Sequence, residues 1–303
     1  MFYNDLRLQY PVKVDTPNPT FARYLQQAIG GIEGEIRVMM QYFFQAWNLP
    51  PSMHKYRDML QQTGAEELGH VEMLATAVAL NLEGASTDLK DEAAQDPAVA
   101  AALGGQLPRH FLSAGLGAMP VNSHGEPFTA AHVVASGNLA ADMYANVMAE
   151  STGRTLAARL YQMTDDPGMQ DMLRYLLARD TMHQNQWLAV IEELGGVEAL
   201  HPIPASIPLQ EERKAPHVDE MNLQYAFMAT GTEPHDGFDG ARFTSGPSVD
   251  GKGEFSMIDK MEPLGDVPEL PEPPPSTFDA PRPQDVAKSG LAKVAQKAKD
   301  ALS

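Results

Sequence analysis

The sequence contains no cysteine, and this absence excludes several classes of chemistry. Without thiols the chain can form no disulfide bond, no iron–sulfur cluster and no haem–thiolate bond, and it has no cysteine nucleophile. The side chains that remain for binding a metal ion are imidazoles and carboxylates. Any metal site in this chain is therefore expected to consist of histidine and acidic residues.

Basic residues and long apolar runs are also scarce. The 303 residues include 22 Lys and Arg against 40 Asp and Glu, which gives a formal net charge of −18. Nucleic acids and anionic membranes attract basic surfaces, so we expect neither as a partner. No apolar run approaches the roughly 18 residues of a membrane span, and the N-terminus lacks a basic region followed by an apolar one. We therefore expect a cytoplasmic protein.

The first part of the chain predicts one extended segment and two helices. Residues 1–18 lack a helical period, whereas Asn18-Pro19 is typical of a helix start, and that helix is expected to continue to about Trp47. A second helix, with Ser52 as its cap, is expected to end near Leu82. The short connection makes the two helices antiparallel neighbours. The first helix also carries a stripe of residues that we expect to be core, namely Met39, Met40, Phe43, Phe44 and Trp47.

A long connection over residues 83–128 separates this hairpin from a second one. A third helix is expected from near Thr129, and Asp166-Pro167 indicates the start of a fourth, which ends at Gly195-Gly196. Two helical hairpins joined by one long crossover have the connectivity of ferritin-like four-helix bundles. We therefore predict an all-α, ferritin-like domain over residues 19–200.

The composition changes after about residue 200. Residues 201–303 are expected to form an irregular, proline-rich C-terminal extension. The prolines of residues 271–275 favour an extended, semi-rigid strap without a core of its own. A tail of this length is unusual within a compact domain, so we expect it to wrap a neighbouring subunit.

Two acid–histidine pairs lie on the predicted helices. Glu67 and His70 are three residues apart on the second helix, and Asp180 and His183 have the same spacing on the fourth. Residues three apart on a helix share a face, so each pair can reach a single metal ion. Both pairs interrupt stripes that are otherwise apolar. Because a buried carboxylate is costly unless it is paired or binds a metal, these pairs indicate a metal site.

Each hairpin also carries an acid on its first helix. On the third helix this acid is Glu150. On the first helix the helical period of the apolar residues does not decide between Glu33 and Glu35. The spacing from Glu35 to Glu67 is close to that from Glu150 to Asp180, so the two hairpins repeat one pattern. Together they are expected to offer two imidazoles and up to four carboxylates to two metal ions.

The charges and donor atoms of this set narrow the choice of metal. Three glutamates and Asp180 carry four negative charges, which balance two divalent ions. Oxygen-rich ligands with two imidazoles favour manganese or iron over copper or zinc, and the spacing does not choose between manganese and iron. The alternatives are a di-iron oxidase, oxygenase or iron-handling protein of the ferritin-like class, and a non-enzymatic helical protein whose buried acids are structural.

Five segments of the first 200 residues carry a family resemblance. They are Leu25 to Met40, Thr63 to Met73, Ser136 to Met143, Leu160 to Asp165 and Leu176 to His183. Together these segments resemble the non-haem manganese catalases. The resemblance implies a ferritin-like bundle, two manganese ions per subunit, disproportionation of hydrogen peroxide to water and dioxygen, and a homohexameric assembly.

The resemblance also implies a set of ligands. Aligned with the motifs of that family, Glu35 is a metal ligand and Glu33 is not. The other implied ligands are Glu67, His70, Glu150 and His183. Glu67 is the expected bridging carboxylate, and the neighbouring Glu66 is expected to be a surface acid.

Three positions depart from the family pattern. Asp180 replaces a Glu that handles protons near the metals, so we expect Asp180 to be the catalytic base that accepts the proton of peroxide. Its side chain is one methylene shorter, which leaves open whether it acts through a water molecule or reaches the metal itself. Ala149 stands where some members have an arginine that lines the channel, so access to the centre is expected to differ. The acidic pair that binds structural calcium in some members is half present, as Asp58 with Gln62, so calcium is not expected.

Overall fold

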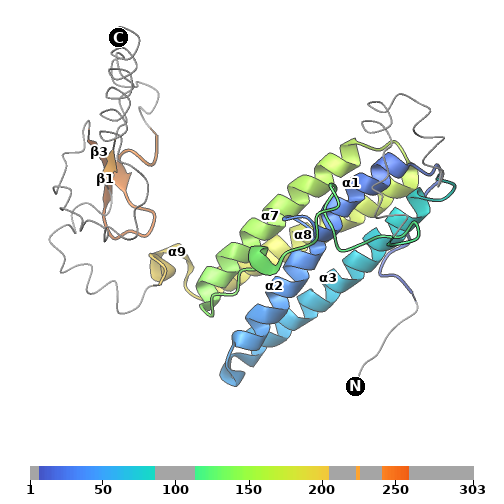
Figure 1. Cartoon of the computed structure of the whole chain (residues 1–303). Helices are drawn as coiled ribbons and strands as arrows, with labels where there is room; N and C mark the ends of the chain where they lie inside the picture. The colour runs from blue at the N-terminus through green and yellow to red at the C-terminus, as the bar shows by residue number, and fades with distance from the viewer. Residues whose placement is uncertain (1–6, 86–112, 205–222, 226–240, 259–303) are drawn as a thin grey trace, which may run out of the picture. The chain divides into compact units, whose positions relative to one another are not determined.

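The long helices lie side by side as a bundle (Figure 1). The computed structural model describes residues 7–85, 113–204, 223–225 and 241–258. The long helices are α1 (Pro19–Gly30), α2 (Glu35–Asn48), α3 (His54–Asn81), α7 (Leu139–Gln162) and α8 (Pro167–Glu193). Helix α3 packs against both α1 and α2, and α7 packs along α8. The predicted bundle of two hairpins is confirmed, with α1 and α2 together in place of the first helix.

The starts of the first and last helices of the bundle are as predicted. Asn18 Oδ1 accepts a hydrogen bond from the backbone N–H of Phe21 at 3.0 Å, and Asp166 Oδ1 accepts one from Met169 at 2.9 Å. A proline follows each cap at the first helical position, where a missing N–H costs nothing. Asparagine and aspartate caps with a following proline therefore fix where α1 and α8 begin.

The first predicted helix is interrupted. Helix α1 ends at Gly30 and α2 begins at Glu35, so the prediction of one continuous helix from residue 19 to 47 is wrong. A Cβ atom at Gly30 would lie 2.6 Å from the backbone nitrogen and oxygen of Val121, so the crossover passes directly against this glycine. The glycines that allow this approach also weaken the helix. As a result, Glu35 lies in the first turn of α2.

The second helix begins later than predicted. A 3₁₀ turn, η1 (Pro51–Met53), precedes α3, which begins at His54. Ser52 therefore lies inside the turn and is not the helix cap, and no side chain caps the start of α3. Because Pro50 and Pro51 have no N–H to donate, this short stretch forms a tight turn before the regular helix.

The third helix also begins later than predicted. Thr129 caps a 3₁₀ turn, η2 (Ala130–His132), and α7 begins only at Leu139. Asn138 is the cap of α7, and its Oδ1 accepts a hydrogen bond from the backbone N–H of Ala141 at 3.1 Å. Threonine and asparagine are both good cap residues, so the residue types alone did not distinguish the turn from the helix.

Two apolar clusters fill the bundle above and below the predicted ligands along the helices. One cluster includes Phe21, Leu25, Ile29, Leu74, Val78, Leu173 and Leu176. The other includes Val38, Tyr42, Ala46, Leu60, Met143, Trp187 and Ile191. His183 lies between Leu176 and Trp187 along α8, so the polar layer is bounded by apolar side chains at both ends. These clusters keep bulk water from the ligands and strengthen electrostatic interactions between them.

Part of the predicted core stripe on α2 is exposed. Phe44 is 42% and Trp47 is 53% exposed, so the prediction that both are core residues is wrong for this chain. The ring of Trp47 stacks on that of Phe43 with centroids 5.5 Å apart. A helix with apolar residues on most of its sides has no face that the helical period alone assigns to the core.

A small sheet lies in the extension that was predicted to be irregular. Its strands β1 (Leu223–Tyr225), β2 (Gly246–Pro247) and β3 (Glu254–Ile258) have the order β1-β3-β2. Strands β2 and β3 are antiparallel, with Gly246 opposite Phe255. A short helix, α9 (Gly196–Leu200), follows α8. The prediction of irregular structure throughout residues 201–303 is therefore wrong for these strands, and the proline run and the predicted strap lie outside the described residues.

No helix in the described ranges is long and apolar enough to cross a membrane.

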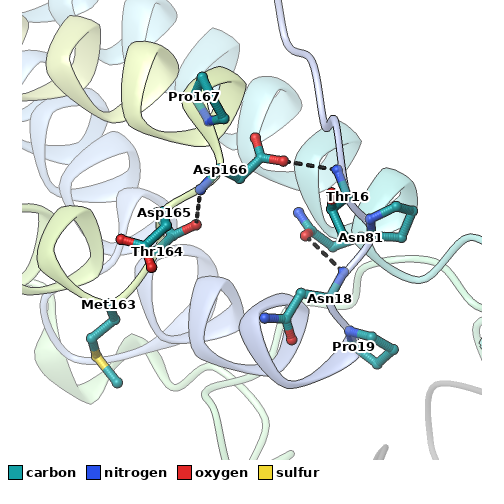
Figure 2. A pocket seen from close by; sticks show the side chains of 10 residues that line it. Thr16, Asn18, Pro19, Asn81, Met163, Thr164, Asp165, Asp166 and Pro167 are labelled. Carbon is teal, nitrogen blue, oxygen red and sulfur yellow. Dashed lines mark hydrogen bonds between the residues drawn. The ribbon is translucent and has the colours of Figure 1, made fainter.

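Asp166 also fastens the N-terminal segment to the bundle (Figure 2). Its Oδ2 accepts hydrogen bonds from the backbone N–H groups of Asp15 at 2.8 Å and Thr16 at 2.9 Å. Nearby, the backbone N–H of Asn18 donates to Asn81 Oδ1 at 3.2 Å. Thr16, Asn18, Asn81 and Asp166 line a cavity of about 460 Å³ between the starts of α1 and α8. One aspartate thus joins a helix cap to an extended segment.

Replacing Asp166 with alanine should lower the free energy of unfolding by about 1–2 kcal/mol, because the helix loses its cap. Burial would raise the pKa of Asp166, but the backbone N–H groups, that of Met169 first, lower it below its ordinary value. A carboxylate with a lowered pKa stabilises the fold above its ordinary pKa, and that stabilisation is lost as the pH falls through the lowered pKa. The difference in unfolding free energy between the variant and the unsubstituted protein should therefore be smaller at acid pH.

Chemical denaturation at neutral and acid pH measures this difference. The matched control is Asp165→Ala, because Asp165 is the exposed neighbour, and its effect should stay within about 0.5 kcal/mol. Equal stability of Asp166→Ala and the unsubstituted protein at neutral pH would contradict the role of this cap.

Candidate metal centre

Five predicted ligands converge in two groups that share one carboxylate. Glu35, Glu67 and His70 each offer an atom within 4.8 Å of the others, and Glu67, Glu150 and His183 do the same. The residues come from α2, α3, α7 and α8, so both hairpins contribute. Because Glu67 belongs to both groups, the arrangement suits two neighbouring ions with one carboxylate between them.

Several atoms of this centre that could bind a metal ion are buried and have no hydrogen-bond partner. His70 is 0% exposed, Glu67 and His183 are each 1% exposed, and the charge of Glu67 has no contact with bulk water. Glu67 Oε1 and both ring nitrogens of His70 and His183 have no hydrogen-bond partner. Buried polar atoms nearly always have one, so five such atoms in one place need another binding partner. The residues present therefore fit a bound pair of metal ions.

Both imidazoles turn the same nitrogen toward the shared carboxylate. His70 Nδ1 lies 2.6 Å from Glu67 Oε2, and His183 Nδ1 lies 2.9 Å from Glu67 Oε1. The other two carboxylates are near the same nitrogens: Glu35 Oε2 is 4.0 Å from His70 Nδ1, and Glu150 Oε1 is 3.4 Å from His183 Nδ1. The two Nδ1 atoms thus face the oxygens that would share an ion with them.

Burial and neighbouring charges shift the pKa values of the side chains in the centre in opposite directions. Burial raises the pKa of Glu35 well above its ordinary value, and the charge of Glu67 adds to this effect. Burial would also raise the pKa of Glu67, but the imidazoles, His70 first, hold it at about 2. Burial would lower the pKa of His183, yet the surrounding carboxylates, Glu150 first, raise it to about 12. A cluster that holds a proton so firmly also attracts metal cations, which would replace that proton.

Asp180 lies beside the ligands and belongs to neither group of the described residues. It is 5% exposed and precedes His183 by nearly one turn of α8. Burial raises the pKa of its carboxyl well above the ordinary value, and the charges of Glu150 and Glu67 add to that. A buried carboxyl group with a raised pKa holds a proton more firmly than a free one and can serve as a proton-transfer group.

Tyr42 is a functional side chain that the sequence reasoning did not single out. Its hydroxyl donates a short hydrogen bond to Glu150 Oε1, and its ring packs on Trp187 with centroids 4.9 Å apart. Burial raises the pKa of Tyr42 well above its usual value, so the phenol keeps its proton and remains a donor. Tyr42 lies two turns after Glu35 on one face of α2, and this spacing was the available signal.

The prediction that Glu66 is a surface acid is wrong. Its side chain is only 24% exposed, with Oε1 3.7 Å from His70 Nε2 and Oε2 3.3 Å from His183 Nε2. Arg179 donates to the same carboxylate, from Nε to Oε1 at 2.5 Å. Glu66 therefore faces the Nε2 atoms of both imidazoles, whereas Glu67 faces their Nδ1 atoms. Its position four residues before His70 on α3 was the signal for this contact.

The structure also answers the question that the helical period left open on the first helix. Glu33 accepts a hydrogen bond from Gln27 Nε2 at 3.2 Å and lies in neither group, whereas Glu35 lies in the first group. Ala149, the position of the missing arginine, is 1% exposed. The alanine side chain at this position adds no positive charge beside the centre, unlike the arginine of some family members.

The chain is similar in sequence and in fold to several known proteins. The sequence profile of a family described as manganese containing catalase matches residues 1–299, well beyond the first 200 residues. A manganese catalase from Bacillus subtilis is 45% identical over 275 residues, which cover 91% of this chain and 96% of that protein. A manganese catalase from Lactiplantibacillus plantarum is 38% identical over 266 residues, 87% of this chain and 97% of that protein. The structure of a manganese catalase from Anabaena superposes with a TM-score of 0.64 at 22% identity, covering 85% of this chain and 99% of that one, and shows a shared fold.

Proposed function

The chain belongs to the manganese catalase family, and from that premise we propose how its residues serve the reaction. The enzyme disproportionates hydrogen peroxide, so that two molecules of peroxide give two molecules of water and one of dioxygen. The di-iron oxidase or iron-handling protein, which the ligand spacing left as an alternative, is not favoured, because the matching family and the similar proteins are manganese catalases.

Two manganese ions bind per chain in this proposal. Glu35 and His70 would hold one ion, Glu150 and His183 would hold the other, and Glu67, which belongs to both groups, would be a ligand to each. The support is the shared carboxylate and three buried atoms without a hydrogen-bond partner, namely Glu67 Oε1 and the Nδ1 atoms of His70 and His183. When bound, a manganese pair supplies reversible two-electron redox chemistry, which matches the two electrons exchanged with each peroxide.

In this proposal Asp180 transfers protons to and from hydrogen peroxide. Peroxide loses protons when it is oxidised to dioxygen, and peroxide needs protons when it is reduced to water. A buried carboxyl with a raised pKa accepts the proton at its carboxylate oxygen in one half of the cycle and returns it in the other. Tyr42 meanwhile holds Glu150 in place through the phenol hydrogen bond, and the apolar clusters around the centre exclude bulk water.

This proposal rests on the position of the Glu67 carboxylate between the imidazoles of His70 and His183. Anomalous diffraction tests the proposed metal positions. Crystals grown with Mn²⁺ and measured at the manganese absorption edge should give two peaks, one beside the Nδ1 atom of His70 and one beside that of His183. Peaks that lie away from the Glu67 carboxylate would contradict the ligand assignment.

The chain forms a homohexamer in this proposal. The number of subunits is what the family resemblance implies, and the large apolar side chains exposed on the described helices are surface that contacts between subunits would cover. They include Phe44, Trp47, Leu68, Met148, Met182 and Leu188. Light scattering on the purified protein should give the mass of six chains, and a monomer would contradict the assembly. The cytoplasmic location stays a prediction from the sequence.

A further inference from the structure

One carboxylate lies between a guanidinium group and two imidazoles. Arg179 of α8 donates from Nε to Glu66 Oε1 at 2.5 Å and from Nη2 to Glu66 Oε2 at 3.3 Å, so its fork engages both oxygens. Those oxygens also face the ring nitrogens described above: Oε1 lies 3.7 Å from His70 Nε2, and Oε2 lies 3.3 Å from His183 Nε2. Each oxygen of Glu66 thus has one imidazole and one nitrogen of Arg179 as neighbours.

We propose that Arg179 is a positioning residue for the manganese centre, acting through Glu66. The arginine fixes the plane of the carboxylate so that each oxygen takes the Nε2–H of one imidazole. Each ring then presents an unprotonated Nδ1 to its manganese ion. The inference rests on the proposed ligand set, in which His70 and His183 bind the metals.

The tautomer of a histidine ligand depends on what its second nitrogen contacts. A carboxylate that accepts the far N–H fixes the ring orientation and makes the metal-binding nitrogen more basic. Here a single carboxylate faces the Nε2 atoms of two rings, at 3.7 Å from His70 and 3.3 Å from His183. A small rotation of the Glu66 side chain would therefore disturb both metal positions together.

Glu66 needs a side-chain partner to keep that orientation. Its backbone is already fixed, because it belongs to α3 and because its carbonyl accepts a hydrogen bond from Gln9 Nε2 at 2.9 Å. Its side chain, however, is 24% exposed, so the carboxylate is partly open to solvent. Hydration of the charge favours rotation of the carboxylate toward water, and the two-pronged contact with Arg179 opposes that rotation. Lysine, with a single point of charge, does not reproduce the fork.

The test compares two arginines of the same helix. In Arg179→Gln the apparent affinity for Mn²⁺ should fall about 10-fold, the lower end of the range for partners of metal-bound histidines. In the control Arg174→Gln the affinity should stay unchanged, because Arg174 contacts Tyr161 and Gln170, away from the centre. Arg179→Lys should lie between the two. Affinity is measured by competition with a chelator, alongside the electron paramagnetic resonance spectrum of the manganese-loaded protein.

A double-substitution cycle separates positioning from simple packing of α3 against α8. Glu66→Gln should lower the Mn²⁺ affinity as Arg179→Gln does, and the double variant should lose little more, because both act through one carboxylate. Losses that add independently, or an Arg179→Gln protein that binds Mn²⁺ like Arg174→Gln and gives an unchanged spectrum, would overturn the inference. In that case the unsubstituted protein still binds manganese, whereas failure of the ligand set itself leaves the unsubstituted protein without it.

Discussion

Replacing Glu67 with alanine should give a folded protein that holds neither manganese ion and evolves no dioxygen above background. Glu67 is the residue shared by both groups of donor atoms, with one oxygen 2.6 Å from His70 Nδ1 and the other 2.9 Å from His183 Nδ1. Removing it takes one ligand from each metal position and also the negative charge that offsets both ions. Among the residues that the structure describes, Glu67 alone belongs to both groups.

Manganese content and dioxygen release of the Glu67→Ala protein measure this effect. The matched control is Glu72→Ala, because Glu72 lies on the same helix and is exposed. That control should keep its manganese and its activity. A Glu67→Ala protein that retains both ions would show that Glu67 is not the bridging ligand.

Replacing Asp180 with asparagine should lower kcat by about 10²–10⁴-fold, the usual contribution of a positioned proton-transfer group, while manganese stays bound. Asparagine has almost the same size and cannot take up the proton. Asp180 lies outside both ligand groups, so its replacement should spare the metals. The two measurements together separate a proton-transfer role from a ligand role.

The conservative variant Asp180→Glu supplies the control for this prediction. It keeps an ionisable carboxyl group in the same buried position on α8, so it should retain far more activity than Asp180→Asn. Loss of manganese from Asp180→Asn would instead make Asp180 a ligand. Unchanged kcat with manganese bound would exclude Asp180 as the base.

The helices and the ligand layer followed from local features of the sequence. The caps Asn18 and Asp166, each before a proline, placed two helix starts correctly because the cap and the proline act within one turn. Acids on apolar helix faces predicted the centre for a similar reason, since burying several carboxylates together requires cations. The structure brings Glu67, Glu150 and His183 together as this pattern predicts.

The features that were missed depend on contacts between distant segments. Helix α1 ends at Gly30, where the backbone of Val121 lies against the glycine. The sequence around Gly30 does not indicate this contact with a distant segment. Glu66 faces the centre because Arg179 reaches it from another helix. The exposure of Trp47 likewise cannot be read from a helix that is apolar on most of its sides.

The measurement that tests the account most directly is metal analysis and peroxide turnover on one sample of the purified protein. The account predicts two manganese ions per chain and one dioxygen released for every two peroxide molecules consumed. The rate should also rise in proportion to manganese content as metal-free protein is reloaded with Mn²⁺. Full dioxygen release from protein without manganese, or no release from protein that holds two manganese ions per chain, would contradict it.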